Sequence, residues 1–167
     1  MPLPTDPATR TYLFTDDMRF VLKAIVMHPR EEKFLIIMRS QTEFVRPGTW
    51  DLPGGCLSYG ELHRDALRRE IFEEAGLLVE GIREAKVLTS FNAEQPMYFL
   101  LVAAQCRATS DLVLLSDEHM AYQWVTREVF LAMDQSYRYV ENRELEIGST
   151  HFLRDIVYEC VCVDPIK

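Results

Sequence analysis

The chain has 167 residues, 48% of them hydrophobic, which is enough for one domain with a substantial buried core. Its 18 Lys and Arg against 26 Asp and Glu give a net charge of −8, which argues against a nucleic acid or an anionic membrane as a partner. The 4 cysteines lack metal-ligand spacing, and no apolar run is long enough to span a bilayer, so we expect a cytoplasmic protein with free thiols.

The first half of the chain is predicted to form an arm, a hairpin, a loop and a helix. Residues 1–16 are polar and contain prolines, which predicts an N-terminal arm at the start of a single domain that spans residues 1–167. Two β-rich runs, at residues 18–27 and 33–38, flank a charged turn and predict the hairpin. Dense turn formers then predict a loop that leads into a helix over residues 62–75.

The second half of the chain is predicted to contain further strands and two helices. The strands are expected at residues 79–90, 97–106, 112–115 and 122–125, and the helices at residues 127–133 and 150–158. Strands that surround one central helix, with helices at the end, indicate a mixed α/β domain. We therefore expect a sheet that is partly antiparallel.

Part of the segment at residues 54–77 is explained by helix formation alone. Ser58 and Glu61 have the S-x-x-E spacing of a capping box, which would satisfy free backbone amides at the start of the helix. Gly76 follows the last predicted helical residue and is expected to be its left-handed C-cap. These residues need no function beyond folding.

Three glutamates near the end of the helix are not explained in this way. With Glu70 at zero on a helical wheel, Glu74 lies at about +40° and Glu73 at about −60°, on the side that carries much of the apolar stripe. They oppose the helix dipole, and Glu70 repels Glu74, at a total cost of about 1–3 kcal/mol. A divalent cation would reverse the sign of these interactions, and carboxylates at this spacing suit Mg²⁺ or Mn²⁺. The alternative is a solvated acidic helix end that Arg68 and Arg69 neutralise.

The same glutamates belong to a longer pattern. From Gly55 the sequence reads Gly, five residues, Glu61, seven residues and then REIFEEAGL at residues 69–77. This pattern resembles, without departure, the signature box of the Nudix hydrolases, the MutT-like pyrophosphatases. The lead-in WDLPGG at residues 50–55 is similar to the family's usual approach to the box.

The resemblance implies a fold and a reaction. The implied fold is a Nudix-type α/β/α sandwich with a mixed, partly antiparallel sheet. The implied reaction is hydrolysis of a diphosphate bond in a nucleoside diphosphate linked to another group, with Mg²⁺, or alternatively Mn²⁺, as the cofactor. Many relatives are dimers, so the resemblance also implies a homodimer.

The resemblance also implies roles for residues at the matching positions. The implied metal ligands are Glu70, Glu73, Glu74 and the backbone carbonyl of Gly55. Arg69 is similar to the family's arginine that orients a box glutamate by a charge-assisted hydrogen bond. Glu61 would pair with that arginine or assist at the metal.

A carboxylate is implied as the catalytic base, and the residues leave its identity open. Glu70 is the candidate from the box, as the base or as the group that orients it. Glu118 is the candidate from a later loop, because Glu118 and His119 followed by residues 123–125 resemble the family's late Glu-His and Trp-Val segment. Glu94 is a weaker loop candidate, and His119 has more often a packing role than a catalytic one.

Two arginines in the loop before the box, Arg39 and Arg46, are candidate contacts to the substrate. We expect that substrate to be a nucleoside triphosphate, including an oxidised one, which would give a nucleotide plus phosphate or pyrophosphate. ADP-ribose or another nucleotide sugar is the alternative. A Nudix-fold domain that binds a nucleotide or a protein without turnover is an alternative of another class, which the intact set of box glutamates disfavours.

Overall fold

The structure is a computed structural model that describes residues 18–44, 46–92 and 97–133, and the helical positions Leu153, Ile156, Val157 and Cys160. The predicted arm at residues 1–16, Glu94 and the remainder of the predicted helix at residues 150–158 lie outside these residues. In chain order the elements are β1 (Met18–Met27), β2 (Phe34–Arg39), β3 (Trp50–Asp51), α1 (His63–Ala75), β4 (Val79–Asn92), β5 (Met97–Ala108), β6 (His119–Val125) and α2 (Arg127–Ala132). Neither α1 nor α2 is long and apolar enough to cross a membrane.

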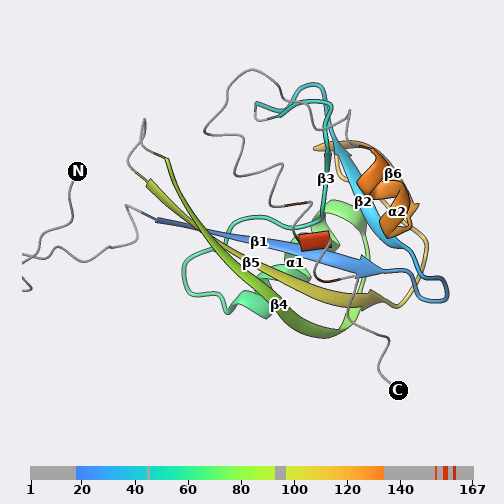
Figure 1. The fold of residues 1–167 in the computed structure, drawn as a ribbon, viewed down its shortest axis with the longest axis horizontal. Helices are drawn as coiled ribbons and strands as arrows, with labels where there is room; N and C mark the ends of the chain where they lie inside the picture. The colour runs from blue at the N-terminus through green and yellow to red at the C-terminus, as the bar shows by residue number, and fades with distance from the viewer. Residues whose placement is uncertain are drawn as a thin grey trace, which may run out of the picture.

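The strands form one mixed, six-stranded sheet in the order β3-β2-β1-β5-β4, and β6 also pairs with β2. β1 and β5 run parallel from Met18↔Tyr98 to Met27↔Arg107, whereas the other neighbouring strands are antiparallel. The register between β1 and β2 contains only Met27↔Phe34. As a result β1, β5 and β4 form one part of the sheet and β2, β3 and β6 another (Figure 1). The expected mixed sheet is confirmed.

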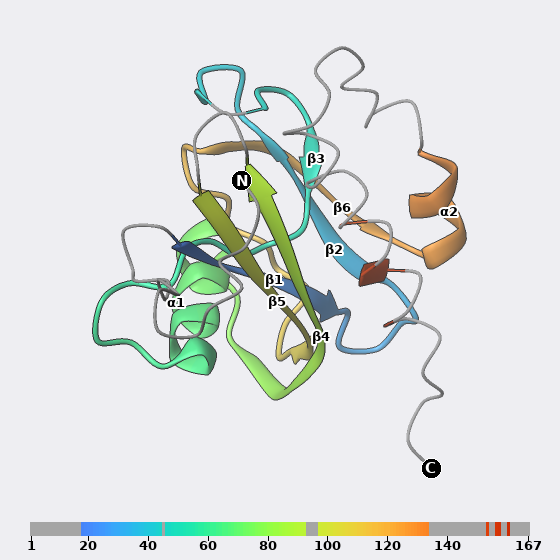
Figure 2. The ribbon, with the colours of Figure 1, turned by 60° about the vertical axis from the view of Figure 1, so that its left-hand side comes forward.

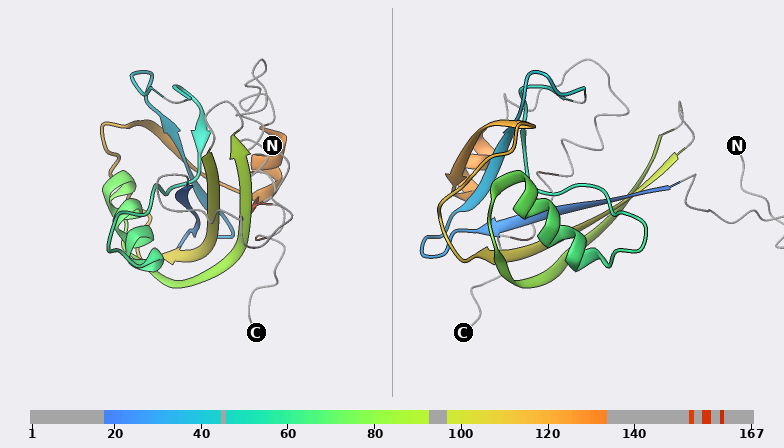
Figure 3. Two further views of the ribbon diagram at one scale, coloured as in Figure 1. Left: turned by 90° about the vertical axis from the view of Figure 1, so that its left-hand side faces the viewer. Right: turned by 180° about the vertical axis from the view of Figure 1, so that it is seen from behind.

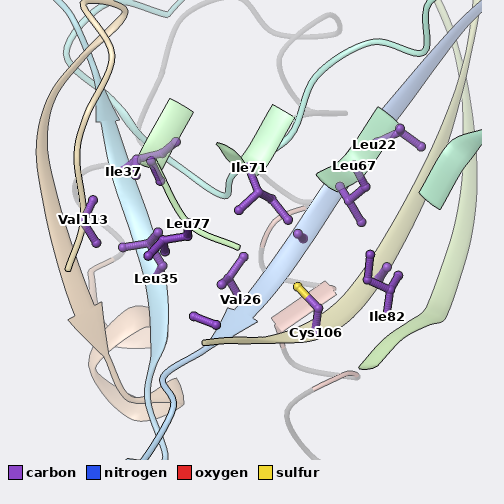
Figure 4. Close-up of a cluster of buried hydrophobic side chains, with 14 of the residues drawn as sticks. Leu22, Val26, Leu35, Ile37, Leu67, Ile71, Leu77, Ile82, Cys106 and Val113 are labelled. Atoms are coloured by element: carbon purple, nitrogen blue, oxygen red, sulfur yellow. The ribbon is translucent and has the colours of Figure 1, made fainter. Parts of the chain in front are cut away.

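Side chains that alternate along β1 divide the core between the two faces of the sheet. Leu22 and Val26 pack with Ile71 of α1 on one face (Figure 4). Ile25 packs with Phe130 of α2 and with the C-terminal helical positions on the other face. The views in Figures 2 and 3 place α1 and α2 on opposite sides of the sheet. The domain is therefore an α/β/α sandwich, as the resemblance implies.

The start of α1 differs from its prediction. The helix begins at His63, and its N-cap residue Leu62 makes no side-chain capping bond, so the capping box at Ser58 and Glu61 is wrong as a helix start. Glu61 accepts a hydrogen bond from the Ser58 N–H at 3.1 Å, but this bond closes a turn ahead of the helix. The helix cannot extend back through Gly60, because its φ of +84° is left-handed.

Residues 112–115 form no strand, in contrast to their prediction. The Leu114 N–H donates to the carbonyl of Ala75 at 2.8 Å instead of to a neighbouring strand. The segment therefore satisfies a backbone carbonyl that the last turn of α1 leaves without a partner. Gly76 is the C-cap of α1, with a φ of +68° and its N–H bonded to the Phe72 carbonyl at 2.8 Å, which confirms the predicted helix end.

Candidate active site

The turn at residues 53–56 is fixed to β1 by backbone hydrogen bonds. The Ala24 N–H donates to the Pro53 carbonyl, and the Leu22 N–H donates to the Gly55 carbonyl, each at 2.8 Å. Gly54 has a φ of +140°, and a Cβ atom added there would lie 2.0 Å from the Leu22 carbonyl oxygen. Glycine is thus required for the chain to pass this close to β1, and the turn presents its backbone to the end of α1.

Glu74 is the most enclosed of the box glutamates, since its side chain is 10% exposed against 17% for Glu70 and 57% for Glu73. Its Oε2 accepts a hydrogen bond from the Gly54 N–H at 2.8 Å. Burial raises the pKa of Glu74 to about 8, and the positive charge of Lys23 offsets this only in part. The metal-free carboxyl therefore retains its proton at neutral pH.

Arg69 connects the other acidic residues of the box. Its Nε and Nη2 donate to both carboxylate oxygens of Glu61, at 2.6 and 3.0 Å. Its Nη1 donates to Glu70 at 2.8 Å and to Glu73 at 2.9 Å. The hydrogen bonds from Arg69 hold the pKa of Glu61 at about 2, so this carboxylate is ionised at neutral pH. Of the two expected roles of Glu61, the pairing with Arg69 is present.

Glu70 lies directly against Gly55. A Cβ atom added to Gly55 would be 2.5 Å from the carboxylate carbon of Glu70, so a side chain at position 55 would have to displace that carboxylate. The Gly55 carbonyl accepts from Leu22 through one lone pair, and a carbonyl oxygen has a second one. The carboxylate of Glu70 thus lies against the Gly55 backbone, and both residues are candidate metal ligands.

The loop before β6 is fastened to the end of α1. The Ser116 N–H donates to the Glu74 carbonyl at 3.1 Å, two residues beyond the bond from Leu114 to Ala75. The Ser40 N–H donates to the Glu118 carbonyl at 2.8 Å. The loop is thereby held between β2 and α1, and Glu118 reaches the helix end although it lies far from the box in sequence.

These contacts bring Glu74, Glu118 and His119 together. One ligand atom of each lies within 4.8 Å of the others. Within the described ranges, this is the one group of three or more His, Cys, Asp or Glu residues close enough to share an ion. The Nε2 atom of His119 is 3.8 Å from Oε1 of Glu74, and its Nδ1 atom is 3.3 Å from Oγ of Ser116. Burial, followed by the charge of Arg39, lowers the pKa of His119, which favours the neutral imidazole.

This set of donor atoms fits a divalent cation. Carboxylate oxygens are the preferred ligands of Mg²⁺ and Mn²⁺, and a neutral imidazole is compatible with the second of these. Glu118 is exposed, so the group is open to solvent on one side. The carboxylates of Glu70 and Glu73 are not in this group, and each is bonded to Arg69 instead.

The two predicted substrate arginines meet at one buried carboxylate. Nη2 of Arg46 lies 2.9 Å from Oδ2 of Asp51, and Nη1 of Arg39 lies 3.9 Å from the same oxygen. Arg39 is also the residue opposite His119 in the pairing of β2 with β6. The arginines are therefore held beside the residues that could bind a metal ion.

Sequence reasoning did not single out Asp51 or Lys23. The Nζ atom of Lys23 lies 2.9 Å from Asp51 and donates to the Leu52 carbonyl at 3.1 Å. Lys23 is the only charged residue between Val21 and Met27, within an apolar strand. A lysine in such a position is rarely buried without a partner. Its place in an apolar strand was therefore the feature of the sequence that could have indicated a buried acidic partner.

Comparisons with known proteins show which family the chain belongs to. A family model described as the NUDIX domain matches residues 19–143. The nucleoside triphosphatase NudI of Salmonella arizonae is 29% identical over 130 residues, which cover 72% of this chain and 85% of the relative. Its namesake from Enterobacter sp. (strain 638) is 31% identical over 111 residues, which cover 60% and 78%.

Solved structures are similar in fold. The MutT protein from Methanosarcina mazei Go1 has a TM-score of 0.62 at 22% identity, and the match covers 87% of this chain and 94% of that one. The MutT NUDIX hydrolase from Burkholderia pseudomallei has a TM-score of 0.61 at 22% identity, with 85% and 97% covered. Because the family model spans most of the sequence, the chain belongs to the Nudix hydrolase family and is an enzyme that hydrolyses phosphorus anhydrides.

Proposed function

We propose that this enzyme hydrolyses a nucleoside triphosphate, including an oxidised one, to a nucleotide and phosphate or pyrophosphate, and that it requires Mg²⁺ or Mn²⁺. The observation that carries the proposal is the convergence of buried Glu74 with Glu118 and His119 at the end of α1. Two relatives with the name nucleoside triphosphatase support the choice of substrate.

In this proposal the box residues hold the cation. The ligands are Glu70, Glu73, Glu74 and the Gly55 carbonyl. The bound ion would neutralise the phosphate oxygens and acidify a water molecule. Arg69 keeps Glu70 and Glu73 oriented by its hydrogen bonds, and Glu61 keeps Arg69 in place.

Glu118 is the proposed base. It is exposed at the open side of the group, where its carboxylate can accept a proton from the attacking water. Glu70 is already bonded to Arg69, so its role is to support that base or bind the ion. Arg39 and Arg46 provide the positive charges for the phosphate groups of the substrate.

The proposal is tested with a panel of nucleoside triphosphates, oxidised deoxynucleotides and ADP-ribose, each in the presence of Mg²⁺, Mn²⁺ or a chelator. Product masses in ¹⁸O-labelled water locate the attacked phosphorus. We expect turnover of a triphosphate that the chelator abolishes. Metal-independent turnover, or a preference for ADP-ribose, would contradict the proposal.

Glu118→Gln is expected to lower kcat by roughly 10²-fold or more, because general base catalysis contributes at least that factor. Asp117→Asn is the matched control, since Asp117 is an exposed acid of the same loop outside the group of ligand atoms. Equal activity of the two variants would remove Glu118 from the reaction and leave a box glutamate as the base.

A further inference from the structure

Asp51 is a fully enclosed carboxylate with more than one cationic partner. Its side chain is 2% exposed, and it contacts Lys23 and Arg46 at 2.9 Å each and Arg39 at 3.9 Å. Its Oδ1 also accepts the Leu52 N–H at 2.8 Å. Burial opposes ionisation, but the charges of Lys23, Arg46 and Arg39 hold the pKa of Asp51 at about 2. Asp51 is therefore an anion at neutral pH.

Three cations gather around Asp51, although a single one would compensate a buried carboxylate. Lys23 and Arg46 each lie 2.9 Å from Asp51 and Arg39 lies 3.9 Å from it, while Glu43 is bonded to Arg39 at 2.9 Å. In a chain with a net charge of −8, such a gathering of cations favours an anionic ligand.

Arg46 also has an unusual backbone. With a φ of +48° it is the only non-glycine residue of the described ranges in the left-handed region. Residues held in such conformations cluster at functional sites. The side chain is only 15% exposed, although arginines are usually solvated, because it is turned toward Asp51. The fold thus maintains a strained residue in order to keep one guanidinium in place.

The cluster lies beside the candidate metal ligands. The charges of Arg39 and Asp51 are close enough to shift the pKa of His119. Those of Lys23 and Asp51 are close enough to shift the pKa of Glu74. Asp51 also begins the segment whose Gly54 N–H is bonded to Glu74. One short segment therefore holds the arginines at one end and a candidate metal ligand at the other.

We propose that Asp51 is a positioning residue that holds the Arg46 and Arg39 guanidinium groups beside Glu74 and His119 to bind the phosphate chain of the substrate. Lys23 is the buried counter-charge that fixes Asp51 to β1. This inference rests on the proposed function, because it takes a polyphosphate as the ligand of the site.

The decisive variant removes Lys23 and Asp51 together, so that neither member of this buried pair is left without the other. Lys23→Met combined with Asp51→Leu replaces the pair by apolar side chains, a change that is often neutral or stabilising in proteins. We expect the thermal unfolding temperature to stay within a few degrees of wild type. The KM for the preferred triphosphate should rise by roughly 10-fold or more, with a smaller change in kcat, because the arginines lose their anchor.

Arg46→Gln provides a second route to the same result. Its side chain is partly exposed, so we expect the variant to fold, with a rise in KM similar to that of the double variant. When Arg46→Gln is combined with the double variant, KM should rise no further, because both changes remove the same interaction with the phosphate groups. Arg64→Gln is the control, since Arg64 pairs with Glu84 on the surface.

Three outcomes overturn the inference. The first is a wild-type KM in the stable double variant, and the second is a wild-type KM in Arg46→Gln. The third is a KM in the combined variant that has risen by the product of the two separate increases.

If the wild-type protein hydrolyses no nucleotide, the proposed function fails. The affinity for inorganic tripolyphosphate in the presence of Ca²⁺ is then measured in place of KM. Binding by wild type that is at least roughly 10-fold weaker in both variants supports the positioning role, and equal or absent binding overturns it.

Discussion

Arg69 and Arg68 are neighbours in the helix with different surroundings. Arg69 donates to Glu61, Glu70 and Glu73, whereas Arg68 donates, among the described residues, to Asp65 alone, at 3.1 Å, and is half exposed. A lysine cannot reproduce the planar set of donors that reaches several carboxylates at once. The consequence of an Arg to Lys change should therefore differ sharply between adjacent positions.

Arg69→Lys is expected to lower kcat/KM by roughly 10- to 100-fold, because Glu70 and Glu73 lose their common donor. Arg68→Lys should leave kcat/KM within about two-fold of wild type, because exposed ion pairs contribute little. Steady-state kinetics with Mg²⁺ and circular dichroism of both variants provide the measurement. Equal kinetics for Arg69→Lys and wild type would show that this arginine is not needed to orient the box glutamates.

The turn between β3 and α1 contains three glycines with separate physical reasons. Gly54 cannot carry a Cβ atom because of the Leu22 backbone, whereas a Cβ atom on Gly55 would displace the Glu70 carboxylate. At Gly60 no atom of the described part of the chain lies within 4 Å of an added Cβ atom, and the constraint is its left-handed φ of +84°. The first contact involves rigid backbone, while the second involves the end of a side chain that can move.

Gly55→Ala is therefore expected to separate activity from stability. The added methyl group displaces Glu70, so kcat should fall by roughly 10²-fold, while the free energy of unfolding changes by less than about 1 kcal/mol. Gly60→Ala is the control, with wild-type kcat and about 1 kcal/mol of lost stability from its left-handed φ. Urea unfolding and kinetics would check both, and a fully active Gly55→Ala enzyme would argue against a role for Glu70 beside this turn.

For the whole molecule, the enclosed Glu74 makes stability depend on pH and metal. Its folded-state pKa is about 8 against an ordinary value of 4.5. The folded state thus binds more protons than the unfolded state between these values, and stability falls as pH rises through that window. A cation that binds the deprotonated carboxylate only in the folded protein has the opposite effect.

We expect the metal-free protein to lose on the order of 2–4 kcal/mol of unfolding free energy from this group between pH 5 and pH 8. Glu74→Gln should remove most of this loss. Mg²⁺ should raise the unfolding temperature of wild type more at pH 8 than at pH 6, and should have little effect on the variant. Urea unfolding in a chelator and thermal unfolding with Mg²⁺ test these expectations. A Mg²⁺ effect that is the same in both proteins would place the ion elsewhere.

Features that depend on short-range spacing could be predicted from the order of the residues. Runs rich in β-forming residues predicted most of the strands, the period of α1 placed Glu70, Glu73 and Glu74 together, and Gly76 marked the helix end. Box spacing was enough to identify the family. The features of the strands and of α1 are fixed by residues within a few positions of each other, where chain geometry alone relates side chains.

The contacts between distant groups, in contrast, depend on how the chain folds in space. Glu118 reaches Glu74 because backbone hydrogen bonds fasten its loop to the end of α1. Leu114, within residues 112–115, makes one of these bonds instead of pairing with a strand. Asp51 contacts Lys23 because β3 and β1 lie in the same sheet and both side chains point into the same buried region. Such contacts join residues far apart in sequence through backbone pairing and exclusion of water, and no local pattern encodes them.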